Sequence, residues 1–329
     1  MPAPPKFFFH GGIYFITTSV ERDFMLPPNP LIREIILKSL AQAQKLYPIE
    51  IIDIIVLPTH VHLLVRILDP ECAASFMERF KTESAHAINR LLGRRRSTLW
   101  CERYDSPYIP DLETALNKIV YIYTNPSNDG AVDRIDEFPG FNTFNLRVSS
   151  SIHPLKAGPI EIGTYVIPRP SFTKLKSHSL DYYTKYRDGL VKGLQSAVVK
   201  ITPNALFEKF GVYDDLSIQH YNQVIIERIR QKEALNRVER ALAKKGVIGA
   251  RKLTKMVIGS AFMPERSGRR MRVHCQNKAL RIETLLWMRD LQRAGKDVRE
   301  RWRVGDYSER YPMGLFPPNG FRLAEPLNW

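Results

Sequence analysis

The sequence predicts an α+β fold, with a ferredoxin-like, four-stranded antiparallel sheet and helices on one face, followed by a basic, mainly helical C-terminal domain. Three observations predict it. Strand and helix periodicities alternate over residues 1–128 in the order β-α-β-β-α-β-α. Nearly every segment carries its own start or stop residue. Beyond residue 160 helical spacing dominates and the charge becomes positive.

The first strands and the first helix have clear boundaries. Residues 11–20 are rich in β-branched and aromatic side chains and predict a strand. Asn29 and Pro30 predict a helix start, with Asn as the N-cap and Pro at the first helical position. Residues 49–57 form a continuous apolar run, which is typical of a central strand covered on both faces. Residues 60–68 predict the next strand.

The remaining elements of the N-terminal part follow in order. Helical spacing over residues 72–93 predicts a second helix, and a short fourth strand is expected near residues 99–109. Asp111 is the expected N-cap of a third helix, which runs to Asn125 and Pro126. Since the residue before a proline disfavours the helical conformation, we expect Asn125 at a frayed helix end.

The chain divides into two predicted domains. Residues 1–148 form the domain described above, and residues 149–160 are a linker rich in Ser, Pro and Gly. Residues 161–329 are expected to form the basic C-terminal domain, with long helices over 218–245 and 278–300.

Composition excludes several classes of protein. The 329 residues are 44% hydrophobic and 25% charged, so wholesale disorder is excluded. No apolar run is long enough to span a membrane, and the first residues make a poor signal peptide. The three cysteines, Cys72, Cys101 and Cys275, lie far apart and form no CxxC pair, which fits a reducing cytoplasm.

The positive charge is unevenly distributed. The formal net charge is +15, but residues 1–150 hold 16 Lys and Arg against 17 Asp and Glu, and residues 151–329 hold 33 against 17. Because phosphate neutralisation supplies most non-specific affinity for nucleic acids, we expect the C-terminal half to be the main DNA-binding part of the chain. Truncation near residue 155 is then expected to weaken DNA binding and its salt dependence.

Two motifs carry candidate chemistry. His60 and His62 lie two residues apart on a predicted strand and therefore share one face, as half of a divalent-metal site would require. Polar decoration of a solvent-facing strand is the alternative. Tyr121 and Asn125 lie four residues apart and share one helix face. Their alternatives are a half-buried aromatic and a helix C-cap.

Together, VLPTHVHLLV and the later YIYTNP resemble the HUH-type single-tyrosine transposases, in particular the REP-associated branch, over about residues 8–145. The resemblance implies that His60, His62 and Asn125 bind Mg²⁺ or Mn²⁺ and that Tyr121 is the catalytic nucleophile. It implies cleavage and rejoining of structured single-stranded DNA, such as a hairpin or palindromic repeat, through a 5′-phosphotyrosine. No nucleotide cofactor or membrane is expected, and the chain would act as a monomer or a homodimer near the nucleoid.

Further residues are candidates for supporting roles. Lys118, one helical turn before Tyr121, is a candidate to favour the tyrosine anion, or else a solvated surface lysine. The basic residues 94–96 with Trp100, and the basic loop 266–272, are candidate DNA contacts. The alternatives are a solvated basic turn beside a core Trp for the first segment and a solvated loop for the second. These residues are Arg94, Arg95, Arg96, Trp100, Arg266, Arg269, Arg270 and Arg272.

Two other functions remain open at this point. One is a domesticated, non-catalytic nucleic-acid-binding protein on the same fold. The other is a HUH replication or mobilisation nickase, although such proteins usually carry extra metal-ligating histidines and often helicase domains. No GxxxxGK[ST] phosphate loop is present in the sequence.

Overall fold

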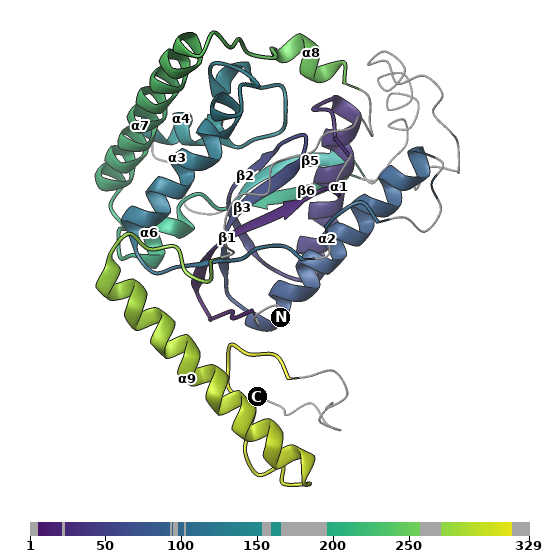
Figure 1. The fold of residues 1–329 in the computed structure, drawn as a ribbon, viewed down its shortest axis with the longest axis vertical. Coiled ribbons are helices and arrows are strands. Elements are labelled where there is room, and N and C mark those ends of the chain that lie inside the picture. Colours follow the sequence, from purple (N-terminus) through teal and green to yellow (C-terminus); the bar gives the residue numbers. More distant parts are fainter. Residues whose placement is uncertain are drawn as a thin grey trace.

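A computed structural model describes residues 6–21, 24–92, 94, 98–101, 103–152, 159–165, 196–256 and 271–317. One six-stranded sheet lies at its centre, between helices on both faces (Figure 1). The strand order is β4-β1-β3-β2-β6-β5. The strands are β1 (Gly12–Ser19), β2 (Glu50–Val56), β3 (His60–Ile67), β4 (Tyr108–Ile109), β5 (Ile160–Tyr165) and β6 (Ser196–Ile201).

The predicted α+β class is confirmed, and the four expected strands pair antiparallel. β1 lies between β4 and β3, and β3 pairs with β2. The sheet then continues beyond the predicted four strands, because β6 adds to β2 in parallel and β5 pairs antiparallel with β6. Both added strands come from beyond residue 148, so one sheet spans the predicted boundary at 149–160. The helix α4 (Phe144–Ile152) already occupies the start of that segment.

Helices α1 (Pro30–Leu46) and α2 (Pro70–Leu91) cover one face of the sheet. The Asn29 side chain caps α1 as predicted, because its Oδ1 accepts a hydrogen bond from Ile32 N at 2.9 Å. Val61, Leu63 and Val65 of β3 point into this core.

The opposite face is also covered, which corrects the expectation of helices on one face. Helices α3 (Leu112–Asn128), α4, α6 (Ala205–Lys209) and α7 (Asp215–Leu242) pack there. The physical reason lies in the central strands, whose second face carries large apolar side chains such as Phe15, Ile55 and Leu64. These side chains are removed from water only when a second helical layer covers them.

Two predicted boundaries were wrong. The strand expected over 99–109 is reduced to Tyr108–Ile109 and isolated bridges at Trp100 and Asp105. Pro107 and Pro110 bracket the short strand, and neither has an N–H for a regular ladder. The third helix continues through Pro126 to Asn128, so Asn125 is helical and buried rather than frayed.

The last described part contains the short α8 (Ala250–Thr254) and the long α9 (Lys278–Arg303). A 3₁₀ turn (Ile135–Glu137) follows α3. Helix α9 extends away from the sheet in Figure 1 and is anchored by ring contact between Trp287 and Phe9, whose centroids are 4.2 Å apart. The three cysteines are unpaired. Within the described residues, no helix has the length and apolarity needed to cross a membrane.

Candidate active site

Two histidines lie side by side at the start of β3. His60 and His62 point to the face that α3 covers, while Val61 is buried on the other face. Their Nε2 atoms are 2.9 Å apart. The Nδ1 atom of His62 lies 2.8 Å from the Thr17 hydroxyl, and that of His60 lies 2.8 Å from the Thr59 hydroxyl. These hydroxyls orient the rings so that the Nε2 atoms face each other.

Both imidazoles are held in the neutral form. Burial lowers the pKa of His60 to about 4. Burial also lowers the pKa of His62 well below its usual value, and the positive charges of His60 and Lys118 lower it further. A neutral imidazole has one nitrogen lone pair. With Nδ1 protonated on both rings, two lone pairs face each other, an arrangement that a cation between them would stabilise.

Asn125 brings a third polar group to the histidine pair. Its Nδ2 atom lies 3.5 Å from His62 Nε2. Its Oδ1 atom is buried and has no hydrogen-bond partner among the described residues. A half-turn of the Asn125 amide exchanges its oxygen and nitrogen and turns the oxygen toward His62.

These three side chains fit a divalent cation. Imidazole nitrogens suit divalent transition-metal ions, and an amide oxygen suits Mg²⁺ and Mn²⁺. An unpartnered buried oxygen beside two facing lone pairs is the observation that supports the fit. In the described part of the chain, no cluster of three or more His, Cys, Asp or Glu side chains could hold a metal. Any ion here would therefore depend on the Asn125 amide.

Tyr121 lies directly beside these groups. Its ring centroid is 5.4 Å from that of His62. The side chain is 45% exposed, so it can be reached from solvent. Burial of the hydroxyl raises the Tyr121 pKa, and the charge of Asp129 raises it further. A hydrogen bond with Asn125 opposes this rise. The phenol is therefore protonated at neutral pH unless further positive charge is brought close.

Lys118 lies beside the Tyr121 ring. Its Nζ atom lies 5.3 Å from the Tyr121 ring centroid and 5.2 Å from that of Phe15. Burial among these rings lowers the Lys118 pKa. The structure thus brings together His60, His62, Asn125, Tyr121 and Lys118, all five of which the sequence had singled out.

The other predicted site residues lie elsewhere. Trp100 is a core residue that is 4% exposed, and its indole N–H donates to Ser84 Oγ at 2.9 Å, so it cannot stack on a base. Arg94 lies over the Phe24 ring and donates to Thr98 O. Arg272 lies over the Phe7 ring. The remaining candidates, Arg95, Arg96, Arg266, Arg269 and Arg270, lie outside the described residues.

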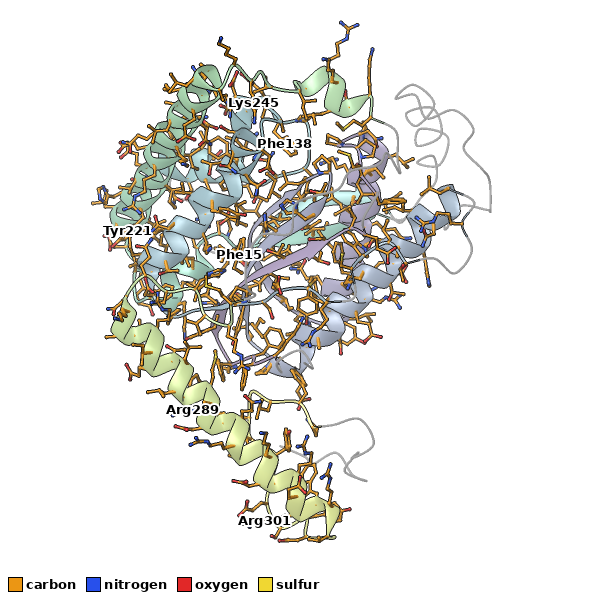
Figure 2. All side chains as sticks on the ribbon, in the orientation of Figure 1. Phe15, Phe138, Tyr221, Lys245, Arg289 and Arg301 are labelled. Carbon is orange, nitrogen blue, oxygen red and sulfur yellow. The ribbon has the colours of Figure 1, made fainter. Side chains whose placement is uncertain are left out.

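Sequence reasoning missed two residues that border this site. Phe15 of β1 stacks on His62 with centroids 4.9 Å apart and meets Tyr121 edge-on at 5.9 Å (Phe15 is labelled in Figure 2). The alternation of β1 could have placed it there, since Phe15 and Thr17 share a face. His274 approaches Phe15 from the C-terminal half, with centroids 6.0 Å apart. No local pattern in the sequence indicates His274.

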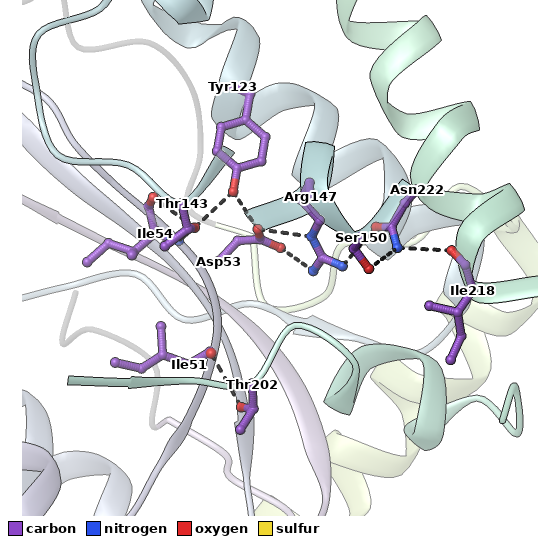
Figure 3. A network of polar contacts seen from close by, with 10 residues as sticks. All are labelled: Ile51, Asp53, Ile54, Tyr123, Thr143, Arg147, Ser150, Thr202, Ile218 and Asn222. Atoms are coloured by element: carbon purple, nitrogen blue, oxygen red, sulfur yellow. Dashed lines mark hydrogen bonds and ion pairs between the residues drawn. The ribbon is translucent and has the colours of Figure 1, made fainter. Parts of the chain in front are cut away.

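A buried polar network fixes the tyrosine helix against the sheet (Figure 3). Asp53 of β2 accepts hydrogen bonds from the Tyr123 hydroxyl and from two nitrogens of Arg147. Arg147 also donates to Asn222 of α7. Tyr123 is two residues after Tyr121, so this network sets the position of the helix that carries the candidate nucleophile.

Helix α7 holds α3 from the outside. Arg228 pairs with Glu113 at 2.7 Å, and Asn236 donates to Ser127 Oγ at 3.1 Å. The Ile135 backbone N–H donates to Glu233, which is 1% exposed. The C-terminal half thus supports both ends of the tyrosine helix.

Two known proteins are similar to part of this chain. A curated Haemophilus influenzae protein named for the REP-associated tyrosine transposases is 26% identical over 156 residues, which cover 45% of this chain and 88% of that protein. A solved structure of a REP-associated tyrosine transposase bound to a REP hairpin shares 22% identity, with a TM-score of 0.39 over 47% of this chain and 89% of that one.

The family comparison covers a defined part of the chain. Residues 13–120 match the family model described as IS200-like transposase. The match includes His60 and His62 and ends one residue before Tyr121. Residues 13–120 therefore carry the sequence pattern of the IS200-like transposases, in agreement with the resemblance seen in the two motifs.

Proposed function

We propose that this protein cleaves and rejoins single-stranded DNA at hairpin structures through a 5′-phosphotyrosine on Tyr121. The observation that carries the proposal is the convergence of His60, His62 and the unpartnered Asn125 oxygen beside a solvent-accessible tyrosine. A nucleophile next to a cation site is what transesterification of a phosphodiester requires.

The chemistry conserves the phosphodiester bond energy. The Tyr121 oxygen loses its proton to solvent and attacks the scissile phosphorus, the new O–P bond forms, and the bond to the 3′-oxygen breaks while that oxygen takes a proton from solvent. The products are a 5′-phosphotyrosine and a free 3′-hydroxyl, so rejoining needs no ATP. A divalent ion held by His60, His62 and Asn125 would supply positive charge to the phosphate and to the leaving oxygen.

The protein's own groups prepare this step. The Lys118 ammonium, whose Nζ atom lies 5.3 Å from the Tyr121 ring centroid, would favour a Tyr121 anion by Coulombic attraction during the reaction. The hydrogen bond with Asn125 acts in the same direction, because it lowers the Tyr121 pKa. The stacked Phe15 keeps water from one face of His62 and so helps to hold that ring neutral.

The C-terminal half is proposed to hold the DNA. Its excess of basic residues gives it a net charge of +16, while residues 1–150 have −1. Helix α9 contributes eight Lys and Arg against four Asp and Glu, and Arg289 and Arg301 are labelled in Figure 2. Phosphate contacts of this kind position DNA without reading its sequence.

Covalent trapping tests the proposal. The protein is incubated with a labelled hairpin that carries random single-stranded flanks, with Mn²⁺ or Mg²⁺, and is then resolved on a denaturing gel. We expect a covalent adduct for the wild-type protein and for Tyr213→Phe, since Tyr213 is 72% exposed and far along the chain from the site. We expect none for Tyr121→Phe or with EDTA.

The outcomes separate the candidate functions. An adduct that persists in Tyr121→Phe would refute the assignment of the nucleophile. Retarded DNA without any adduct from the wild-type protein would instead favour the non-catalytic DNA-binding alternative.

A further inference from the structure

A segment from the C-terminal half runs along the edge of the candidate active site. Residues 272–276 add to the β4 edge, where the Tyr108 N–H donates to Arg272 O and the His274 N–H donates to Tyr108 O, both at 2.9 Å. The Gln276 N–H then donates to Thr114 Oγ1 at 3.2 Å, in the first turn of α3. The backbone around His274 is therefore fixed relative to the tyrosine helix.

The His274 side chain faces the same aromatic ring as the catalytic candidates. The Phe15 ring centroid lies 6.0 Å from that of His274 and 5.9 Å from that of Tyr121. It lies 5.2 Å from the Lys118 Nζ atom. Burial, together with the nearby positive charge of Lys118, lowers the His274 pKa to about 4. Near pH 7 this ring is therefore a neutral donor and acceptor of hydrogen bonds beside an ammonium group.

Lys118 has no counter-ion among the residues that the structure describes. Its neighbours are the rings of Phe15 and Tyr121 and the neutral imidazoles of His62 and His274. A partly buried ammonium without an anion is costly, and an incoming phosphate would supply one. This unneutralised charge lies next to the proposed nucleophile.

We propose that His274 and Lys118 form a phosphate-binding pair that contacts the DNA backbone at the phosphate attacked by Tyr121. Lys118 supplies the charge, and the His274 ring N–H supplies a directed hydrogen bond. The proposal rests on the proposed function, since it takes Tyr121 as the nucleophile. It adds to the site a residue from outside the matched segment 13–120.

Two measurements test the pair. The first is the single-turnover rate of adduct formation with the random-flank hairpin and Mn²⁺ at saturating DNA. We expect His274→Ala to slow it about 10- to 100-fold, as loss of a hydrogen bond to a charged group does. His274→Gln, which keeps a neutral N–H donor, should recover part of this loss. His220→Ala is the matched control, because His220 is an exposed histidine on α7.

The second measurement is the affinity for fluorescent dT12 in the absence of metal, by anisotropy at several salt concentrations. Lys118→Met should flatten the logarithmic salt dependence by about 0.7, the value for one phosphate contact on a single strand. His274→Ala should weaken binding without changing that slope, because its ring is neutral. Replacing the phosphates of dT12 by methylphosphonates should remove the difference between His274→Ala and wild-type protein.

The outcomes for the pair and for the proposed function are distinct. Wild-type adduct rates and dT12 affinities in both His274 variants would overturn the pair and leave the Tyr121 chemistry intact. Weaker dT12 binding by His274→Ala, with no adduct from the wild-type protein, would support the phosphate contact and overturn the proposed function. If His274→Ala does not fold, the comparison of His274→Gln with wild-type protein decides.

Discussion

Replacing Arg147 by methionine should lower the free energy of unfolding by about 3–5 kcal/mol, because it leaves the buried Asp53 carboxylate without its counter-ion. The two side chains are 0% and 1% exposed, and they meet through two contacts of 2.6 and 3.2 Å. Methionine keeps most of the alkyl packing, so the loss reports on the charge. Among the residues that the structure describes, the Tyr123 hydroxyl would then be the one remaining side-chain donor to Asp53.

The magnitude can be separated from a packing effect by a double-mutant cycle. Adding Asp53→Asn to Arg147→Met removes the buried charge and keeps an oxygen for the Tyr123 hydroxyl. We expect this double variant to recover about 2 kcal/mol or more of the loss, since a pair removed together leaves no unpaired ion. Urea unfolding followed by circular dichroism measures the wild-type protein, the two single variants and the double variant.

An exposed ion pair provides the control. Arg303 pairs with Glu300 on α9, and both side chains are more than half exposed. Arg303→Met should change stability by less than about 0.5 kcal/mol. A loss below about 1 kcal/mol in Arg147→Met, or a double variant as unstable as the single one, would refute the view that this pair anchors the tyrosine helix.

Three further predictions concern the site and its surroundings. Mn²⁺ at 100 times its Kd should raise the wild-type Tm by about 4 °C, and a similar rise in His62→Ala, measured by scanning calorimetry, would argue against the site. Alanine at both Arg289 and Arg293 should flatten the salt dependence of dT12 binding by about 1.4, and an unchanged slope would exclude α9 from the DNA contact. The free energy of unfolding should fall as the pH drops from 6.5 toward 4. His60 and His274 have pKa values of about 4 in the folded protein and near 6.5 in the unfolded chain. Between these values only the unfolded state takes up their protons, which favours unfolding. Urea midpoints that do not change between pH 7 and pH 5 would contradict it.

Local signals account for the part of the fold that was predicted. The strands β1, β2 and β3 follow from period-two alternation and apolar runs, and the Asn29 cap follows from its place before Pro30. The juxtaposition of His60 and His62 follows from strand alternation alone. Tyr121 and Asn125 meet because they are one helical turn apart.

Non-local pairing accounts for what was not predicted. The parallel contact of β6 with β2 joins Ile51 to Ile201, and periodicity contains no information about such a partner. Trp100 is ambiguous in sequence, since an indole can stack on a base or fill a core. Its N–H finds a partner in Ser84, which only the packed structure reveals. His274 reaches the site through a bridge between Tyr108 and Val273.

The two halves of the chain divide by charge but not by packing. Leu206, Phe207 and Ile225 from the basic half are fully buried against the face of the sheet that carries the histidines. Truncation near residue 155 would expose that core and remove the α7 contacts that hold α3. Weaker DNA binding after truncation could then result from unfolding as readily as from the loss of DNA contacts. Substitution of exposed α9 arginines removes charge while leaving the support of the tyrosine helix in place, so it can separate DNA binding from the positioning of Tyr121.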